Sequence, residues 1–149
     1  MKILILHGVN LNMFGRRDEK HYGRLTLAEI NSQLEQLARE LGCELEIFQS
    51  NDEAAFIDKI HAMAFACSGV VINAGAWTHY SYAIADALAI MACPVVEVHM
   101  SRVFDREDFR ARSVLAHVAA GSIAGFGVAS YLLGLRAVVA LADALAAAQ

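Results

Sequence analysis

The chain of 149 residues is 57% hydrophobic and 19% charged, and its formal net charge is −4. This length and composition predict one globular domain, residues 1–149, with a sizeable core. The mildly acidic balance argues against nucleic acid or an anionic membrane as a partner, because the arginines between positions 102 and 112 are interrupted by acidic residues.

Short apolar runs alternate with longer segments of helical periodicity along the whole chain. Strands are expected at 2–6, 44–48, 69–73, 94–100 and 122–126, and helices at 27–41, 53–66, 81–91 and from about 128 onward. Apolar strands joined through helices are typical of a parallel sheet that is covered on both faces. The pattern therefore predicts an α/β fold, a flavodoxin-like three-layer sandwich around a five-stranded parallel sheet.

The first strand leads into a polar loop at about 10–25, "NLNMFGRRDEKHYGRLT", which ends where Thr26 and Glu29 have the spacing of a helix capping box. The apolar run before the loop is too short for a secretory signal, so we expect a cytoplasmic protein. A tyrosine acts as a base only when a nearby cation favours the phenolate, and Arg17 could supply that charge to Tyr22. The loop is then either a lid that closes over a site or a solvated, charged excursion.

The residues that follow each strand form the candidate site, because ligands of open parallel sheets bind beyond the carboxyl ends of the strands. The third strand ends at Asn73, and Gly75 lets the backbone approach a ligand closely. His79, near the start of the next helix, could contact that ligand or be structural. Asp86 lies about two turns further on and is expected to be exposed or to face another subunit.

The fourth strand, "VVEVHMS", carries polar side chains in a stretch that is otherwise apolar. A period of two puts Glu97, His99 and Ser101 on one side of the strand. A hydrogen bond from His99 to the carboxylate would orient the ring and favour the imidazolium, as a general acid requires. The alternative is a satisfied pair in the core without a chemical role.

Several classes of ligand lack their sequence patterns. Neither a dinucleotide fingerprint nor a phosphate-binding loop follows the first strand. The three cysteines, Cys43, Cys67 and Cys93, are widely spaced and lack the close pairs of zinc or redox motifs, so we expect reduced, buried thiols. The apolar stretch 121–135 is shorter than a membrane span and is expected to belong to the core.

The chain resembles the type II dehydroquinases in six ordered segments: "NLNMFGRRDEKHYGRLTLAEI", "FQSN", "INAGAWTHYSYAIADAL", "VVEVHMS", "REDFRARS" and "GSIAGFGVASYLLGL". Members of that family are cofactor-independent 3-dehydroquinate dehydratases. The resemblance implies a reversible anti elimination of water from a small-molecule substrate, 3-dehydroquinate. The product would be 3-dehydroshikimate, formed through an enolate with neither a cofactor nor a metal.

The resemblance also implies a role for each of five candidate catalytic residues. Tyr22 would be the general base that removes the C2 proton, with Arg17 favouring its phenolate. His99, oriented by Glu97, would protonate the departing C1 hydroxyl. Asn10 would hold a water against the developing enolate oxygen.

Substrate contacts and assembly follow from the same resemblance. Together with Gly75, the implied substrate-binding residues are Asn73, His79, Asp86, Met100, Ser101, Arg106 and Arg110. Ser101 and the backbone around Met100 would bind the carboxylate, and Arg106 would support the site. Asp86 would come from a neighbouring subunit of a homo-oligomer, a dodecamer built from four trimers.

Two alternatives stay open from the sequence. The strand ends and the segment after them carry four potential zinc ligands: His7, His79, His99 and Glu97. These could serve a metal-dependent hydrolase, although they lack a close paired spacing. A non-catalytic flavodoxin-like binding module is favoured only by departures from the family pattern, Val9 in place of proline and Arg102 in place of asparagine.

Overall fold

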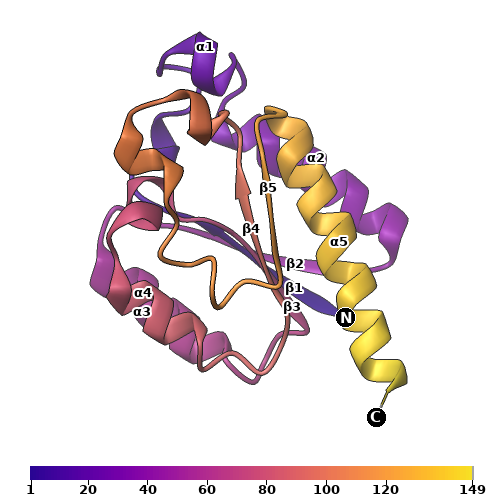
Figure 1. The fold of residues 1–149 in the computed structure, drawn as a ribbon. Helices are drawn as coiled ribbons and strands as arrows, with labels where there is room; N and C mark the ends of the chain where they lie inside the picture. The colour runs from indigo at the N-terminus through magenta and orange to yellow at the C-terminus, as the bar shows by residue number, and fades with distance from the viewer. Residues whose placement is uncertain (149) are drawn as a thin grey trace.

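The computed structural model describes residues 1–148, which build a five-stranded sheet (Figure 1). Its strands are β1 (Lys2–His7), β2 (Glu44–Gln49), β3 (Gly69–Asn73), β4 (Val95–His99) and β5 (Gly121–Ala124). All pairings are parallel and the order is β2-β1-β3-β4-β5, which confirms the predicted flavodoxin-like α/β fold. The direction of strand addition reverses between β1 and β3, so a ligand crevice is expected beyond their carboxyl ends.

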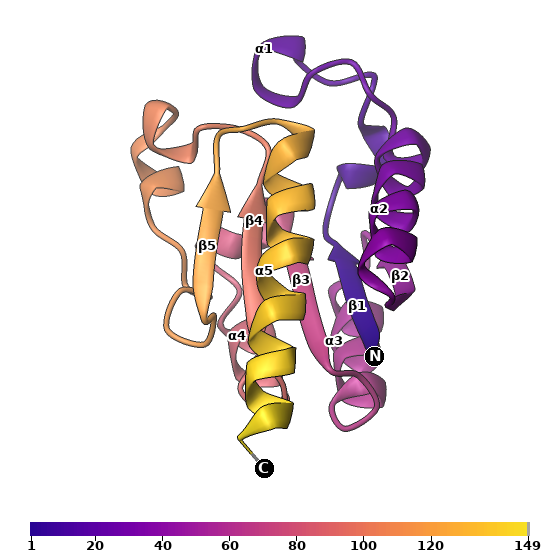
Figure 2. The same ribbon diagram turned by 90° about the vertical axis from the view of Figure 1, so that its right-hand side faces the viewer.

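Four long helices cover the two faces of the sheet. On one face lie α2 (Leu27–Leu41) and α5 (Val128–Ala147), and on the other lie α3 (Glu53–Met63) and α4 (Tyr82–Leu88) (Figures 1 and 2). The short helices are α1 (Glu19–Tyr22) and four 3-10 helices, η1 (Leu11–Met13), η2 (Gly75–His79), η3 (Val103–Asp105) and η4 (Asp108–Ala111). Each of them follows the carboxyl end of a strand, where the candidate site residues are expected.

Alternating residues of the central strands build two separate cores. In β1, Ile3 and Ile5 pack with α2 and α5, whereas Leu4 and Leu6 pack with α3 and α4, and all four are fully buried. Successive side chains of a strand point to opposite faces, so a continuous apolar run is what a doubly covered strand needs.

The helix boundaries agree with the sequence prediction at some ends and differ at others. α2 spans the expected residues and begins with the predicted capping box, in which the Thr26 hydroxyl accepts from the Glu29 amide at 3.2 Å. The helices expected at 53–66 and 81–91 are shorter, because the backbone after Met63 and Leu88 closes single turns instead of continuing the helix. The helix α1, inside the expected loop 10–25, was not predicted.

The helix α5 is 20 residues long and is apolar enough, by length and composition alone, to cross a membrane. The stretch 121–135, expected to be too short for a membrane span, contributes β5 and the beginning of this helix. Core helices of soluble proteins pass the same test, and α5 packs against β3, β4, β5 and α2. Its buried residues include Tyr131, Leu135 and Val138, which supports the predicted core position.

The prediction of buried thiols is wrong. All three cysteines are half-buried, and the sulfur atoms of Cys67 and Cys93 lie 3.7 Å apart. They are 26 positions apart in the sequence, but each stands just before one of the neighbouring strands β3 and β4. Parallel pairing brings the amino ends of these strands together, which sequence spacing does not reveal.

Candidate active site

Eleven of the thirteen predicted site residues line one small cavity of about 80 Å³ at the carboxyl edge of the sheet. They are Asn10, Arg17, Tyr22, Asn73, Gly75, His79, His99, Met100, Ser101, Arg106 and Arg110. Of the other two, Glu97 lies behind His99, and Asp86 stands on α4 outside the cavity. The parallel topology therefore gathers residues from three separate parts of the chain, at the ends of β1, β3 and β4.

Tyr22, at the end of α1, presents its hydroxyl to two arginines. The phenol oxygen accepts hydrogen bonds from Nη2 of Arg17 at 3.0 Å and from Nη1 of Arg106 at 2.7 Å. The guanidinium carbon of Arg17 lies 3.9 Å from the centre of the tyrosine ring, and the side chain is only 8% exposed. Two cationic donors therefore converge on this one oxygen.

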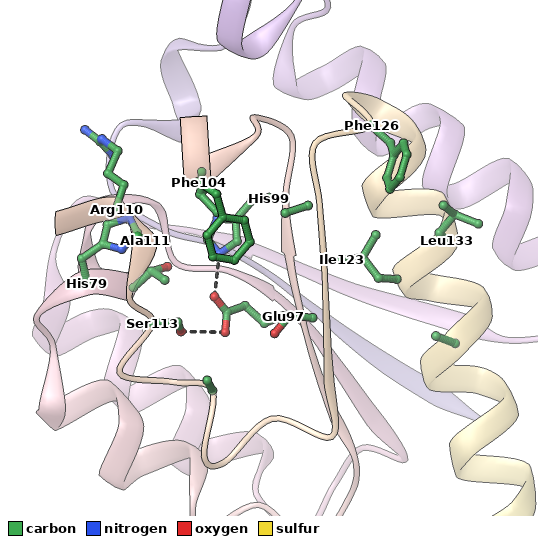
Figure 3. Close-up of a pocket in the computed structure, with 16 residues that line it drawn as sticks. His79, Glu97, His99, Phe104, Arg110, Ala111, Ser113, Ile123, Phe126 and Leu133 are labelled. Atoms are coloured by element: carbon green, nitrogen blue, oxygen red, sulfur yellow. Dashed lines mark hydrogen bonds and ion pairs between the residues drawn. The ribbon is translucent and has the colours of Figure 1, made fainter. Parts of the chain in front are cut away.

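A buried chain of hydrogen bonds runs beneath the cavity. Nε2 of His99 donates to Oε1 of Glu97 at 2.6 Å, and the hydroxyl of Ser113 donates to Oε2 of the same carboxylate at 2.7 Å (Figure 3). Both carboxylate oxygens are therefore bonded, as a buried charge requires. The backbone amide of Leu115 donates to the Ser113 oxygen at 3.1 Å, which orients the hydroxyl toward Glu97. This arrangement leaves Nδ1 of His99 as the nitrogen that can serve a ligand.

The ends of β1 and β3 approach so closely that only glycine fits at two positions. A Cβ on Gly8 would overlap the backbone carbonyl of Ala74, and a Cβ on Gly75 would lie 2.7 Å from the Val9 oxygen. Gly75 also has φ +61°, a region that other residues rarely adopt. Its amide donates to Oδ1 of Asn73 at 3.1 Å. The close approach at Gly75 is thus to the backbone of Val9, and its approach to a ligand stays a prediction.

Asn10 has the left-handed backbone conformation, with φ 67°, at the start of η1. Its amide donates to Oδ1 of Asn51 at 2.8 Å, and Gln49 donates to the same oxygen at 3.2 Å. The amide of Gln49 also donates to the Gly8 carbonyl at 3.2 Å. The end of β2 therefore fixes the turn that presents the Asn10 side chain at the cavity.

His79 and Arg110 also line the cavity, and Figure 3 shows them next to each other. Nδ1 of His79 donates to the carbonyl of Arg112 at 2.7 Å, so Nε2 is left for a ligand. Burial lowers the pKa of His79 below its ordinary value, which favours the neutral ring. Arg110 is held by Glu107, which accepts from its Nε at 2.7 Å.

A larger groove of about 810 Å³ adjoins the cavity and extends over the edge strand β5 (Figure 3). Its inner end is formed by polar residues of the site, among them Glu97, His99 and Ser113. Its outer walls are apolar, and the large side chains Phe104 and Phe126 are 75% and 65% exposed. The single chain thus leaves an apolar surface open directly beside the histidine–glutamate pair.

The family model described as dehydroquinase class II matches residues 1–147 of the chain. The chain belongs to the class II dehydroquinases. A 3-dehydroquinate dehydratase of Leptothrix cholodnii is 59% identical over 145 residues, 97% of this chain and 97% of that one. One from Syntrophotalea carbinolica is 58% identical over 137 residues, 91% of this chain and 93% of that one. The crystal structure of a type II dehydroquinase from Butyrivibrio crossotus matches with TM-score 0.90 and 41% identity over 93% and 97% of the two chains.

Of the four zinc ligands considered from the sequence, His7 lies apart from the other three in this dehydroquinase. His7 lies on the α2 and α5 side, where its Nδ1 accepts from the Tyr131 hydroxyl and its Nε2 donates to Asn31, both at 2.9 Å. Within residues 1–148, no group of three or more His, Cys, Asp or Glu side chains is placed to hold a metal ion. The geometry therefore gives no support to the metal-dependent hydrolase.

Two residues of the dehydroquinase site were not identified from the sequence. Ser113 lies at the end of the motif "REDFRARS", but nothing in its spacing indicates that it bonds to Glu97, 16 positions away. Asn51 ends the segment "FQSN" but was assigned no role, and its contact with Asn10 spans 41 positions. The sequence signal that could have found them is their place just after a strand or beside the candidate edge, which many loop residues share.

Proposed function

We propose that this dehydroquinase removes water from 3-dehydroquinate by anti elimination through an enolate, with Tyr22 as the general base and His99 as the general acid. The observation that carries the proposal is that two side chains able to transfer protons, Tyr22 and His99, line one cavity in different environments. One is a phenol oxygen bonded by two guanidinium groups, and the other is an imidazole bonded by a buried carboxylate. These are the environments that a base and an acid need, respectively.

In the first step, the phenolate of Tyr22 takes the proton from C2 of the substrate. Arg17 and Arg106 stabilise the phenolate before the transfer, and their charges remain to balance the enolate that forms. Residues 10–25 act as a lid, because Arg17 and Tyr22 both belong to this segment while Arg106 comes from the loop after β4. Closing the lid therefore assembles the base and excludes water from it.

The enolate oxygen is stabilised by a water that the side chain of Asn10 holds. A developing negative charge is best served by donors that are already oriented when the charge appears. The bonds from Asn51 and Gln49 support this role, since they restrain the turn that carries Asn10. Asn51 is thus a positioning residue in the proposal.

In the second step, Nδ1 of His99 gives its proton to the C1 hydroxyl, which leaves as water while the C1–C2 double bond forms. Glu97 favours the imidazolium before the transfer and fixes the ring through Nε2. Ser113 holds the far oxygen of Glu97 and keeps the carboxylate in the plane of that bond. Exchange with solvent then returns a proton to His99 and removes one from Tyr22.

Substrate recognition is assigned to the remaining residues of the cavity. Asn73, His79 and Arg110 contact the substrate hydroxyls, and Ser101 with the backbone at Met100 binds the carboxylate. The hydroxyl of Ser101 already accepts from Arg106 at 3.3 Å, so the same arginine supports both the base and the carboxylate site.

The proposal includes assembly into a dodecamer of four trimers, with Asp86 supplied by a neighbouring subunit. Asp86 is exposed on α4 and does not line the cavity of its own chain. The groove beside Glu97 and His99 is open and walled by Phe104 and Phe126, as expected of a surface that another copy covers. Sedimentation of the purified protein tests this part: a twelve-chain species supports it, and a monomer contradicts it.

The chemical proposal is tested by the absorbance of the conjugated enone of 3-dehydroshikimate on addition of 3-dehydroquinate. Wild-type protein should produce it without added cofactor, and Tyr22→Phe should lower kcat by about 10³-fold or more with much less change in KM. The matched control is Tyr80→Phe, which removes the hydroxyl of an exposed tyrosine outside the cavity. Near-normal turnover by Tyr22→Phe would reject the base.

A further inference from the structure

Cys67 and Cys93 lie together at the edge of the sheet opposite the candidate active site. Each precedes a strand, β3 or β4, and the two sulfur atoms are 3.7 Å apart. Backbone hydrogen bonds hold the two connecting loops together on both sides of this contact. The Val70 amide donates to the Pro94 carbonyl at 2.9 Å, and the Ala92 amide donates to the Ala64 carbonyl at 3.2 Å.

We propose that Cys67 and Cys93 form a reversible disulfide and so make a redox-modification site in this protein. A disulfide needs sulfur atoms about 2.05 Å apart, so the pair must close by roughly 1.6 Å, a distance that side-chain rotation can supply. Both side chains are half-buried against the α3 and α4 core, which leaves them open to a small oxidant. The oxidant that reacts at this site is therefore a peroxide or a low-molecular-weight disulfide.

The contact assigns different roles to the two thiols. Cys67 is placed to donate to the Met63 carbonyl, so Cys93 is the thiol that donates to the Cys67 sulfur. This bond lowers the pKa of Cys67 and raises that of Cys93, since it stabilises negative charge on the Cys67 sulfur. Cys67 is the nucleophile and Cys93 the resolving thiol.

The reaction with hydrogen peroxide proceeds in two balanced steps. The Cys67 thiolate attacks one peroxide oxygen, the O–O bond breaks, and the products are a sulfenic acid and, after proton uptake, water. The Cys93 sulfur then attacks the Cys67 sulfur, the S–O bond breaks, and a second water leaves with the proton of Cys93. Two thiols are oxidised by two electrons in total, and peroxide is reduced to two waters.

The disulfide would enclose the segment that carries one wall of the candidate site. Residues 67–93 contain β3, η2 and α4, and with them Asn73, His79 and Asp86. Cross-linking the ends of this segment restricts its unfolded states, whereas the cavity at the far edge keeps its geometry. Oxidation is therefore expected to stabilise the fold and to leave kcat within about two-fold of the reduced value.

The chemistry is tested by treating the purified protein with hydrogen peroxide, alkylating the remaining thiols and measuring intact and peptide masses. We expect two of the three thiols to become protected within a single chain, a 67–93 linked peptide two hydrogens lighter, and full reversal by dithiothreitol. Cys43 should stay alkylated and serves as the internal control. Chains linked to each other, or Cys67 carried on to the sulfinic acid while Cys93 stays alkylated, would overturn the proposal.

Thermal unfolding of matched variants tests the consequence. Oxidised wild type and oxidised Cys43→Ser should both melt about 10 °C above their reduced forms, as expected for a closed loop of roughly 27 residues. Cys67→Ser and Cys93→Ser should show no rise in melting temperature on oxidation, because each variant lacks one of the two thiols that the disulfide needs. Equal melting temperatures for oxidised and reduced wild type would overturn the predicted stabilisation.

Discussion

One buried histidine, His7, should make this dehydroquinase sensitive to acid. The ring is fully buried, with Nδ1 accepting from the Tyr131 hydroxyl and Nε2 donating to Asn31. Burial lowers its pKa from 6.5 to about 4. Protonation would place a charge in the core and turn Nδ1 into a donor that faces a hydroxyl proton.

The magnitude follows from the two pKa values. The unfolded chain binds this proton below about pH 6.5, whereas the folded protein binds it only below about pH 4. Because the unfolded state holds more protons in that interval, stability is complete above pH 6.5 and is lost as the pH falls toward 4. At roughly 1.4 kcal/mol per pH unit, about 3 kcal/mol of unfolding free energy disappears.

Urea unfolding measures this loss when it is repeated from about pH 7.5 to about pH 4.5 at one protein concentration. The variant His7→Asn cannot titrate in this range, so its unfolding free energy should fall by about 3 kcal/mol less than that of wild type. His61→Gln removes an exposed histidine of α3 and should keep the wild-type slope. Equal pH slopes for wild type and His7→Asn would refute the reasoning, whatever their absolute stabilities.

Three further changes test separate contacts of the fold and the site. Arg17→Ala and Arg106→Ala should each lower kcat about 10- to 100-fold, since each removes a cationic donor from the phenolate of Tyr22. Each should also move the rising limb of the pH–rate profile to higher pH, and an unmoved limb would contradict the pairing. Ser113→Ala should lower kcat about 10-fold with little change in KM, because a buried oxygen of Glu97 loses its hydrogen-bond donor. Ser113→Thr keeps the hydroxyl and should restore most of the lost kcat. Wild-type kinetics in the alanine variant would contradict the positioning role. Gly8→Ala should lower the free energy of unfolding in urea by about 2 kcal/mol or more, because the new Cβ would overlap the backbone beyond β3. The control Gly121→Ala places its Cβ in open space and should differ little from wild type. Equal effects of the two changes would argue against the close approach at Gly8.

The patterns that predicted the fold correctly are local ones. Continuous apolar strands indicated a doubly covered parallel sheet, and the Thr26–Glu29 spacing located the start of α2. Period two in β4 paired Glu97 with His99, which the structure joins at 2.6 Å. Each of these depends on residues no more than four positions apart, whose relative placement follows from backbone geometry alone. The sequence by itself therefore determined the strands, the four main helices, the fold class and the site's histidine–glutamate pair.

Only the tertiary structure decided which distant groups meet. The second arginine on Tyr22, Arg106, is 84 positions away, and the Cys67–Cys93 contact spans 26. Such contacts depend on the strand order β2-β1-β3-β4-β5 and on the path of loops that have no periodicity. Asp86 is a second example. The local pattern predicts its helix, but only the tertiary structure shows that its side chain lies outside the cavity of its own chain. Local periodicity places a side chain on a face, and only the packing of the elements determines what that face meets.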